Sequence, residues 1–300
     1  MDFRIICAHA LTILLWGSAF PGIRVGLEEY TPEHLSLLRL LIGSAGLLVF
    51  ALMVKMKLPK RRDIPAILLL GGLGFAGYHI GLNYGETMVN AGTASVIVST
   101  TPIFAAAFAS LFLKDKLSWF GWIGGIVALI GICFISFGSG GNFQFNIGTL
   151  FILLGAVSES IYFVFQTNYL KKYGFLPFTT YTIWAGTLWM LIFTPGLWEA
   201  VAEASHYVNM TVLYLGIFPT VLPYFAMAYV TSRSGASEAT SSLYLTPVTA
   251  FLIAWIWLGE MPTAFVLIGA LITIIGVLIA HLTPGKMKKE SRDATRAVSS

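Results

Sequence analysis

The chain has 300 residues, of which 57% are hydrophobic and 11% charged, and its mean hydropathy is +0.80. Soluble domains are about one quarter charged, so this chain has too few polar side chains to cover a water-soluble globule. Lipid must therefore be the solvent for most of it. The net charge of +4 does not indicate nucleic-acid binding, because the basic residues fall in loops between apolar segments.

The two cysteines, Cys7 and Cys133, both lie inside apolar runs. This position predicts buried, unpaired thiols rather than a disulfide or a metal site. The first run continues to Val25, and Asp2 stands where a signal peptide carries only basic charge. The N-terminal segment is therefore interpreted as an uncleaved first helix.

The apolar runs are long enough for membrane-spanning helices, each of which needs about 20 mostly apolar residues. No run shows the alternation of a strand. The sequence predicts an all-α integral membrane protein with ten transmembrane helices. These lie at roughly 5–25, 35–54, 64–86, 92–112, 119–137, 147–169, 178–197, 211–231, 238–258 and 264–283.

Basic residues collect in the cytoplasmic loops of membrane proteins. With the N-terminus placed inside, sixteen Lys and Arg residues fall in inner segments and none in outer loops. The inner residues are Arg4, Lys55, Lys57, Lys60, Arg61, Arg62, Lys114, Lys116, Lys171, Lys172, Arg233, Lys286, Lys288, Lys289, Arg292 and Arg296. The outer loops carry Glu28, Glu29, Glu33, Glu199, Glu203 and Glu260. This asymmetry predicts a multi-pass protein of the cell membrane with both termini in the cytoplasm.

A shift of 145 residues superposes two long blocks of the sequence without a gap. The identical pairs include Ala91/Ala236, Ala94/Ala239, Thr101/Thr246, Pro102/Pro247, Phe120/Phe265, Gly124/Gly269 and Gly131/Gly276, with Gly71/Gly216, Tyr84/Tyr229 and Pro32/Pro177 further upstream. Tyr30 and Tyr173 correspond to within two residues. The chain therefore contains an internal repeat.

Each repeat has five helices, an odd number, so the second copy must enter the bilayer upside down. Loop charges agree, because the acidic Glu28–Glu29 corresponds to the basic Lys171–Lys172. Inverted repeats are the construction of many secondary transporters, which bind substrate near the midplane between the halves. Duplication retained only for packing is the alternative. The pattern favours transport.

These features resemble the drug/metabolite transporter superfamily of the EamA type. The resemblance rests on the two repeats, the loop charges, the opening Trp16–Phe20, Arg39 early in the second helix, the Thr-Pro pairs, the acids Asp115 and Glu260, and the Gly-rich fifth and tenth helices. It divides the chain into a first repeat at 8–137, a second at 147–283 and a cytoplasmic tail at 284–300. It implies a central cavity lined by the first four helices of each half, and export or exchange of amino acids, other metabolites or toxic compounds. The second repeat departs by carrying Trp184 where the first has Arg39.

Ionisable side chains in hydrocarbon are costly and are usually functional or paired. Glu159 lies near the middle of the sixth helix, where we expect it to bind a proton or a substrate amine, or to serve as a hydrogen-bonded structural acid. Arg39 is expected either to bind a substrate carboxylate or to pair with Glu28, Glu29 or Glu33. Glu86 and Glu238 lie near helix ends, where we expect water to reach them.

His79 and Asn83 are four residues apart and share a helix face, with Tyr78 and Tyr84 beside them and Tyr224 and Tyr229 at corresponding places in the eighth helix. This pattern favours a polar and aromatic cavity over ordinary interhelical hydrogen bonding. The candidate substrate-binding residues are Trp16, Arg39, His79, Asn83, Glu159, Tyr162, Tyr224, Tyr229 and Tyr244.

Pro102 and Pro247 are expected to kink the fourth and ninth helices and are candidate hinges. Glycines at helical spacing in the fifth and tenth helices allow close contact, either within one chain or between two chains of a homodimer.

The sequence contains no GxxxxGK[ST], HExxH or GxSxG motif and no metal-spaced cysteines. We therefore expect no cofactor, no metal, no ATPase subunit and no enzymatic activity. The partners expected are a small-molecule substrate and membrane lipid. The function indicated is secondary transport of an amino acid or related metabolite, most naturally as an exporter. A toxic-compound efflux carrier is the first alternative, ahead of a channel or a membrane-embedded enzyme.

The predicted topology is tested on a chain whose native cysteines have been replaced. A membrane-impermeant thiol reagent applied to intact cells is expected to label a cysteine at Asn142 and to spare one at Lys60, because the outer loops contain no basic residue. The reverse labelling would overturn the topology and the inversion of the repeats with it.

Overall fold

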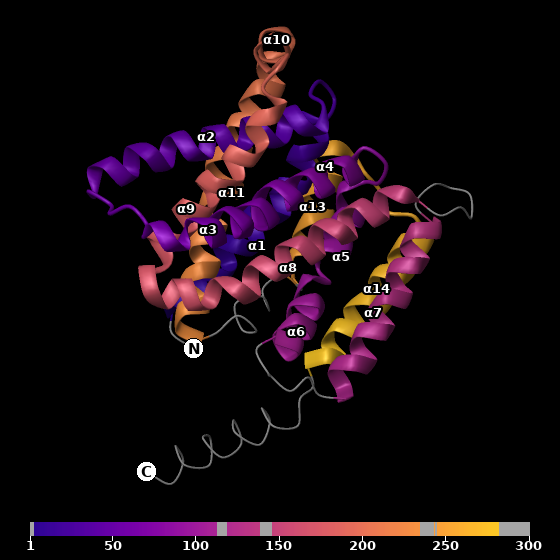
Figure 1. Cartoon of the computed structure of the whole chain (residues 1–300). Helices are drawn as coiled ribbons and strands as arrows, with labels where there is room; N and C mark the ends of the chain where they lie inside the picture. Colours follow the sequence, from indigo (N-terminus) through magenta and orange to yellow (C-terminus); the bar gives the residue numbers. More distant parts are fainter. Residues whose placement is uncertain (1–2, 113–118, 139–145, 235–242, 244, 282–300) are drawn as a thin grey trace.

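A computed structural model describes residues 3–112, 119–138, 146–234, 243 and 245–281, and every regular element in these ranges is a helix (Figure 1). Expected features at Asp115, Asn142, Glu238 and Tyr244 and in the tail after Pro284 lie outside the described residues. The helices are α1 (Phe3–Gly26), α2 (Pro32–Met53), α3 (Ile64–Gly71), α4 (Tyr78–Glu86), α5 (Ala91–Val98), α6 (Thr101–Phe112), α7 (Trp119–Gly138), α8 (Ile147–Tyr173), α9 (Phe175–Met190), α10 (Leu197–Glu203), α11 (His206–Ser234), α13 (Thr246–Leu258) and α14 (Ala264–His281).

Seven helical segments are long and apolar enough to cross a membrane. They are Phe3–Gly26, Pro32–Met53, Arg61–Glu86, Ala91–Phe112, Ile147–Tyr173, Phe175–Phe193 and His206–Arg233. Three shorter apolar helices, Trp119–Phe134, Thr246–Leu258 and Ala264–Gly276, lie where the sequence predicts the remaining spans. The chain is thus a multi-pass helical membrane protein.

Two expected continuous helices are interrupted. Between α3 and α4 the chain forms a π-helical turn at Gly72–Gly77, a distortion that is frequent at functional sites. The fourth span is broken at Ser99–Thr100 between α5 and α6. Pro102 therefore stands in the first turn of α6, and Pro247 stands in the first turn of α13. The predicted mid-helix kinks are wrong, because proline is accepted at a helix start, where its missing N–H leaves no hydrogen bond broken.

Most of the helices form two bundles. In the first bundle α1 contacts α11 and α13, and in the second bundle α8 contacts α3, α4 and α6. Helix α5 contacts α1 and α13 as well as α8, so it lies between the bundles. Helices α2 and α9 contact each other, and each also contacts a helix of both bundles. Helices α7 and α14 form a separate pair at one side (Figure 1).

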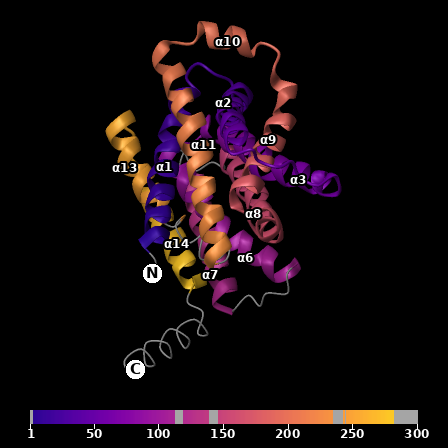
Figure 2. The same cartoon turned by 90° about the vertical axis from the view of Figure 1, so that its left-hand side faces the viewer.

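Hydrogen bonds fasten the ends of each bundle. The Tyr30 hydroxyl after α1 donates to Asn209 of α11, and the Tyr173 hydroxyl at the end of α8 donates to Asp63 before α3. Lys172 forms an ion pair with the same Asp63. Helix α10 lies across the end of the molecule that carries Glu28 and Glu29 (Figure 2), where the Glu29 carboxylate accepts from the Ser205 backbone N–H.

The outward faces are apolar. Large hydrophobic side chains such as Leu52, Ile192 and Ile256 are 71%, 72% and 79% exposed, as expected for a surface that faces lipid. Cys7 and Cys133 also lie exposed and unpaired on this surface, so the prediction that they are buried is wrong. An apolar run shows that a residue lies in a span but not whether it faces protein or lipid.

The α7–α14 pair explains the glycines of the fifth and tenth helices. A Cβ atom on Gly276 would lie 2.3 Å from the Ala128 backbone N and 2.6 Å from the Gly124 carbonyl oxygen, and one on Gly131 would lie 2.5 Å from the Thr273 N. Backbone atoms cannot swing aside, so only glycine permits this approach. These glycines serve packing within one chain, as in other membrane helix pairs.

We predict that Gly276→Ala lowers the thermal stability of the purified protein, by about 1–3 kcal/mol, because the helices must move apart. Gly46→Ala is the matched control, since nothing lies within 4 Å of a Cβ built there. The measurement is the apparent melting temperature in detergent. Equal melting temperatures for both variants would contradict the packing.

Candidate functional site

Two small cavities lie between the bundles, and each is lined by residues from both. We name the first the Arg39 chamber, and it is lined by Trp16, Ala19, Phe20, Ile23, Arg39, Tyr78, His79, Leu82, Pro219 and Tyr224. We name the second the Glu159 chamber, and it is lined by Trp16, Phe20, Tyr78, Ser95, Val98, Ser99, Glu159, Leu243 and Thr246. Trp16, Phe20 and Tyr78 line both, so the chambers are neighbours separated by aromatic side chains.

The aromatic walls are packed against one another. The Tyr224 ring lies 5.1 Å from that of Trp16 in an edge contact and 4.6 Å from that of Phe75. The Trp16 indole N–H donates to the Pro219 carbonyl oxygen at 3.1 Å. Pro219 and Pro223 both lie inside α11. Neither has a backbone N–H for the hydrogen bonds of the helix. These contacts fix the position of Trp16, which with Phe20 of the same helix lines both chambers.

Arg39 of α2 is only 3% exposed. Its Nη2 donates to the Thr220 hydroxyl at 3.5 Å, while Nε and Nη1 have no hydrogen-bond partner among the described residues. Among the described residues Arg39 forms no ion pair with Glu28, Glu29 or Glu33, the alternative to substrate binding; Glu33 instead accepts from Tyr84 and Glu29 from Ser205. A buried cation without a counter-charge costs several kcal/mol. The arrangement leaves two donors free for an anion in the Arg39 chamber.

Glu159 of α8 is 1% exposed and lines the Glu159 chamber. Its Oε1 accepts a hydrogen bond from the Tyr224 hydroxyl at 3.0 Å. Since Tyr224 belongs to α11, this bond joins the two bundles. The adjacent Ser160 hydroxyl contacts the Thr101 carbonyl oxygen at 2.9 Å, so the residues around Glu159 also hold the broken fourth span. The position suits binding of a proton or a substrate amine.

The other predicted site residues divide into two groups. His79 lines the Arg39 chamber, with Nδ1 2.8 Å from the Phe75 carbonyl oxygen. Tyr162 is buried and packs on Phe75 with ring centres 5.3 Å apart, so it supports the chamber wall. Asn83 turns away and donates to Ser36 of α2 at 2.8 Å. Tyr229 packs on Phe175 and Arg233, away from both chambers. His79 and Asn83 were expected to line one cavity because they share a helix face, but only His79 lines a chamber.

One buried acid was misjudged from the sequence. Glu86, expected to be accessible to water, is 0% exposed, and neither carboxyl oxygen has a hydrogen-bond partner among the described residues. Its position at the end of α4 predicts exposure, but the side chain is enclosed within the fold, and Arg24 of α1 bonds its backbone carbonyl oxygen. The sequence gives no local signal for such an enclosure.

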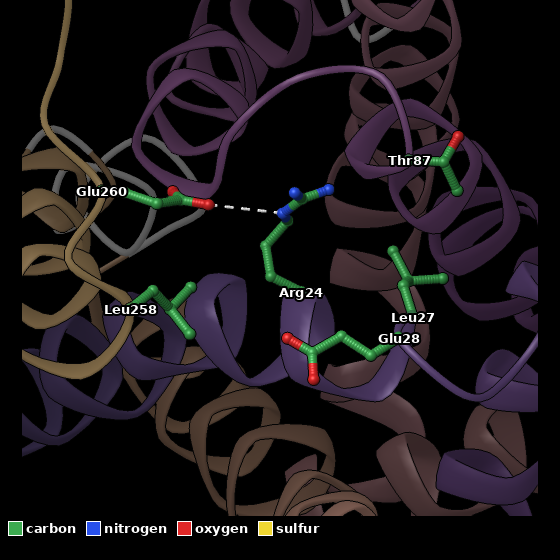
Figure 3. A pocket seen from close by; sticks show the side chains of 6 residues that line it. All are labelled: Arg24, Leu27, Glu28, Thr87, Leu258 and Glu260. Carbon is green, nitrogen blue, oxygen red and sulfur yellow. Dashed lines mark hydrogen bonds and ion pairs between the residues drawn. The ribbon is translucent and has the colours of Figure 1, made fainter.

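A larger pocket opens above Glu86. It is lined by Arg24, Leu27, Glu28, Thr87, Leu258 and Glu260 (Figure 3). The Arg24 Nε lies 3.3 Å from the Glu260 Oε1, and this ion pair crosses the pocket in Figure 3. The Arg24 Nη1 also donates to the Glu86 backbone carbonyl oxygen at 2.5 Å, and the Ala91 N–H donates to Glu260 at 3.0 Å. These contacts close one end of the space between the bundles.

Apolar spans around a buried, charged and aromatic internal site define a membrane transport protein rather than a lipid-embedded scaffold. The chain belongs to the EamA-like transporter family, which it matches over residues 3–137 and again over 146–282. The resemblance found in the sequence is thereby confirmed.

Similar proteins are named as transporters or exporters. The chain is 55% identical to the uncharacterized transporter YdfC of Bacillus subtilis, covering 95% of this chain and 94% of the relative. It is 34% identical to a probable terminal-alkyne amino-acid exporter of Streptantibioticus cattleyicolor, covering 98% and 99%. It is 29% identical to the uncharacterized inner membrane transporter YedA of Escherichia coli K12, covering 85% and 87%. A protein of known crystal structure shares the fold, with a TM-score of 0.66 at 18% identity over 94% of this chain and 98% of that one.

We predict that Arg39→Met raises the thermal stability of the substrate-free protein while abolishing transport, because it removes a buried charge that has no counter-ion. Arg24→Met is the control, because Arg24 is ion-paired and its loss is expected to leave stability unchanged or lower it. Apparent melting temperatures in detergent provide the comparison. A destabilised Arg39→Met that still transports would show that Arg39 serves the fold alone.

Proposed function

We propose that this protein is a secondary transporter that moves an amino acid or a closely related zwitterionic metabolite across the cell membrane, in the direction of export. It works by alternating access, so that the two chambers face one side of the membrane at a time.

The observation that carries the proposal is the pair of opposite charges in adjoining chambers. Arg39 offers two unused guanidinium donors on one side of the Trp16–Tyr78 wall, and Glu159 offers a carboxylate on the other. A guanidinium binds a carboxylate well, and a carboxylate binds an ammonium group. A zwitterion neutralises both residues at once. An apolar solute would leave both charges without a counter-charge.

Alternating access is supported by the symmetry of the helix contacts. By the repeat, α1 corresponds to α8 and α2 to α9, while α11 corresponds to the span of α3 and α4, and α13 to the span of α5 and α6. Exchanging each helix for its counterpart turns the contact α1–α11 into α8–α4, α1–α13 into α8–α6, and α2–α11 into α9–α3. All of these contacts are present, while α2–α9 and α7–α14 exchange with themselves. The Tyr30–Asn209 and Tyr173–Asp63 bonds form a matching pair. Such halves can provide two states of similar energy, one open to each side.

Orientation and direction rest on weaker signs. The loop charges favour an orientation with Glu28 and Glu260 outside the cell, and in that orientation the Arg24–Glu260 contacts lie at the outer end. One relative is named as a probable exporter of an amino acid. Export follows if loading occurs from the cytoplasm while the outer end is closed.

Efflux of hydrophobic cations is the alternative that one observation favours. Trp16, Phe20 and Tyr78 beside Glu159 would suit a flat cation. The neighbouring Arg39 repels such a solute, and this weighs for the zwitterion.

Counterflow in proteoliposomes distinguishes these functions. Vesicles loaded with unlabelled amino acids are expected to accumulate radiolabelled amino acid in a saturable manner. Excess amino acid should compete, whereas the decarboxylated amine and the deaminated acid should compete poorly, since each engages one charge only. Competition by hydrophobic cations alone would favour the efflux carrier. Bulk conductance would indicate a channel, and a covalently altered substrate would indicate an enzyme.

We predict that Glu159→Gln lowers counterflow by at least about tenfold, since the loss of one buried charged contact is worth roughly 1.5–3 kcal/mol. Glu199→Gln, at an exposed position of α10, is the control and should transport normally. If Glu159→Gln inserts normally and transports at the wild-type rate with an unchanged pH profile, Glu159 is a structural residue.

A further inference from the structure

Glu86 is a titratable group that the proposed substrate site does not use. Its side chain is fully buried at the end of α4, and both carboxyl oxygens lack a hydrogen-bond partner among the described residues. A buried carboxylate in this condition costs several kcal/mol, and the usual response is to take up a proton. The carboxyl group is therefore compatible with this closed arrangement only in its neutral form.

The charged groups around Glu86 come from separate elements. Arg24 of α1, Glu260 after α13 and Arg39 of α2 act on it electrostatically. Glu33 of α2 is held by Tyr84 of α4. Helix α5 carries no titratable side chain, and the acid of α8, Glu159, bonds Tyr224 in its own chamber. Arg24 is a potential counter-ion, because its Nη1 already bonds the Glu86 backbone, but its Nε is directed to Glu260.

One contact beside Glu86 crosses from the first bundle to the second, and another reaches α5, which lies between the bundles. Arg24 and Glu260 belong to the first bundle and its adjoining loop, whereas the groups that they bind, the Glu86 carbonyl oxygen and the Ala91 N–H, belong to α4 and α5. Separation of the bundles at this end must break the bond between Arg24 and the Glu86 carbonyl oxygen. Arg24, which bonds the Glu86 backbone, and Thr87, the next residue, line the pocket of Figure 3, so we expect this opening to bring water from the pocket to the Glu86 carboxyl group. Opening and hydration of Glu86 are therefore one event.

We propose that Glu86 is a proton-binding site that couples the outer end of the transporter to protons. With Glu86 protonated, the Arg24–Glu260 pair bridges the bundles and the outer end is closed. When the outer end opens, Glu86 releases its proton to external water, and its carboxylate takes Arg24 as its counter-ion. Closing requires the proton to be taken up again. A low external pH thus favours the closed state, and each opening and closing cycle exchanges one proton with the outer solution.

The test measures opening of the outer end of the transporter in the absence of substrate. A single cysteine replaces Ala19, which lines the Arg39 chamber, in a chain whose native cysteines have been replaced. An impermeant methanethiosulfonate reagent is applied to the outer face of washed right-side-out membrane vesicles, prepared without amino acids, at several external pH values. Labelling rates are compared between chains with Glu86 and with Glu86→Gln. Thiol ionisation contributes equally to both chains, so their ratio reports opening.

With Glu86 present, the labelling rate relative to Glu86→Gln should rise with external pH, by up to about tenfold per pH unit, the limit for linkage to one proton. Glu86→Asp should retain the pH dependence, which guards against a mere folding defect. Glu28→Gln, an exposed acid of the same pocket, should behave as the parent chain does. A ratio independent of pH, or a dependence removed by Glu28→Gln instead, would overturn the proposal. Because no substrate is present, a failure of amino-acid counterflow leaves this result unaffected.

Discussion

A charged side chain inside a bilayer must find a partner or serve a purpose, because hydrocarbon solvates it poorly. In the part of the chain that the structure describes, three residues with an ionisable carboxyl or guanidinium group are at most 3% exposed: Arg39, Glu159 and Glu86. None of them belongs to an ion pair among the described residues. Arg39 and Glu159 line the chambers between the bundles, and Glu86 lies beneath the contacts that join the bundles at one end. The need to neutralise these groups by substrate, proton or counter-ion is what the proposed mechanism depends on.

The rest of the fold keeps these three residues in place. Tyr224 bonds Glu159 across the bundle interface, and Trp16 packs against Tyr224. Helices α7 and α14 approach each other so closely that their glycines admit no Cβ atom, which makes that pair a rigid side wall. The broken fourth span and the π-helical turn before α4 place the irregular backbone where buried protein surrounds it, as a bilayer requires.

The sequence was sufficient for the helical runs and the family, because hydropathy, loop charge and the repeat are properties of whole segments. It also predicted Arg39 and Glu159, since a lone charge in an apolar run is conspicuous. The sequence did not predict the exposure or direction of a side chain where these depend on another segment of the chain. Glu86 looked exposed beside a helix end, Cys7 looked buried, and Asn83 looked like a cavity residue, yet each is placed by a neighbouring helix that no local pattern specifies. The repeated prolines indicated an irregularity in the helix but not whether it was a kink or a break.

The central claim is that the two bundles separate at one end while the chambers stay between them. Pulsed electron spin resonance on spin labels at Thr87 and Met261, both exposed at the end that Arg24 and Glu260 close, measures that separation directly. The account predicts two distance populations in lipid, with the longer one growing as external pH rises and the shorter one restored at low pH. A single distance that ignores both pH and added amino acid would contradict it.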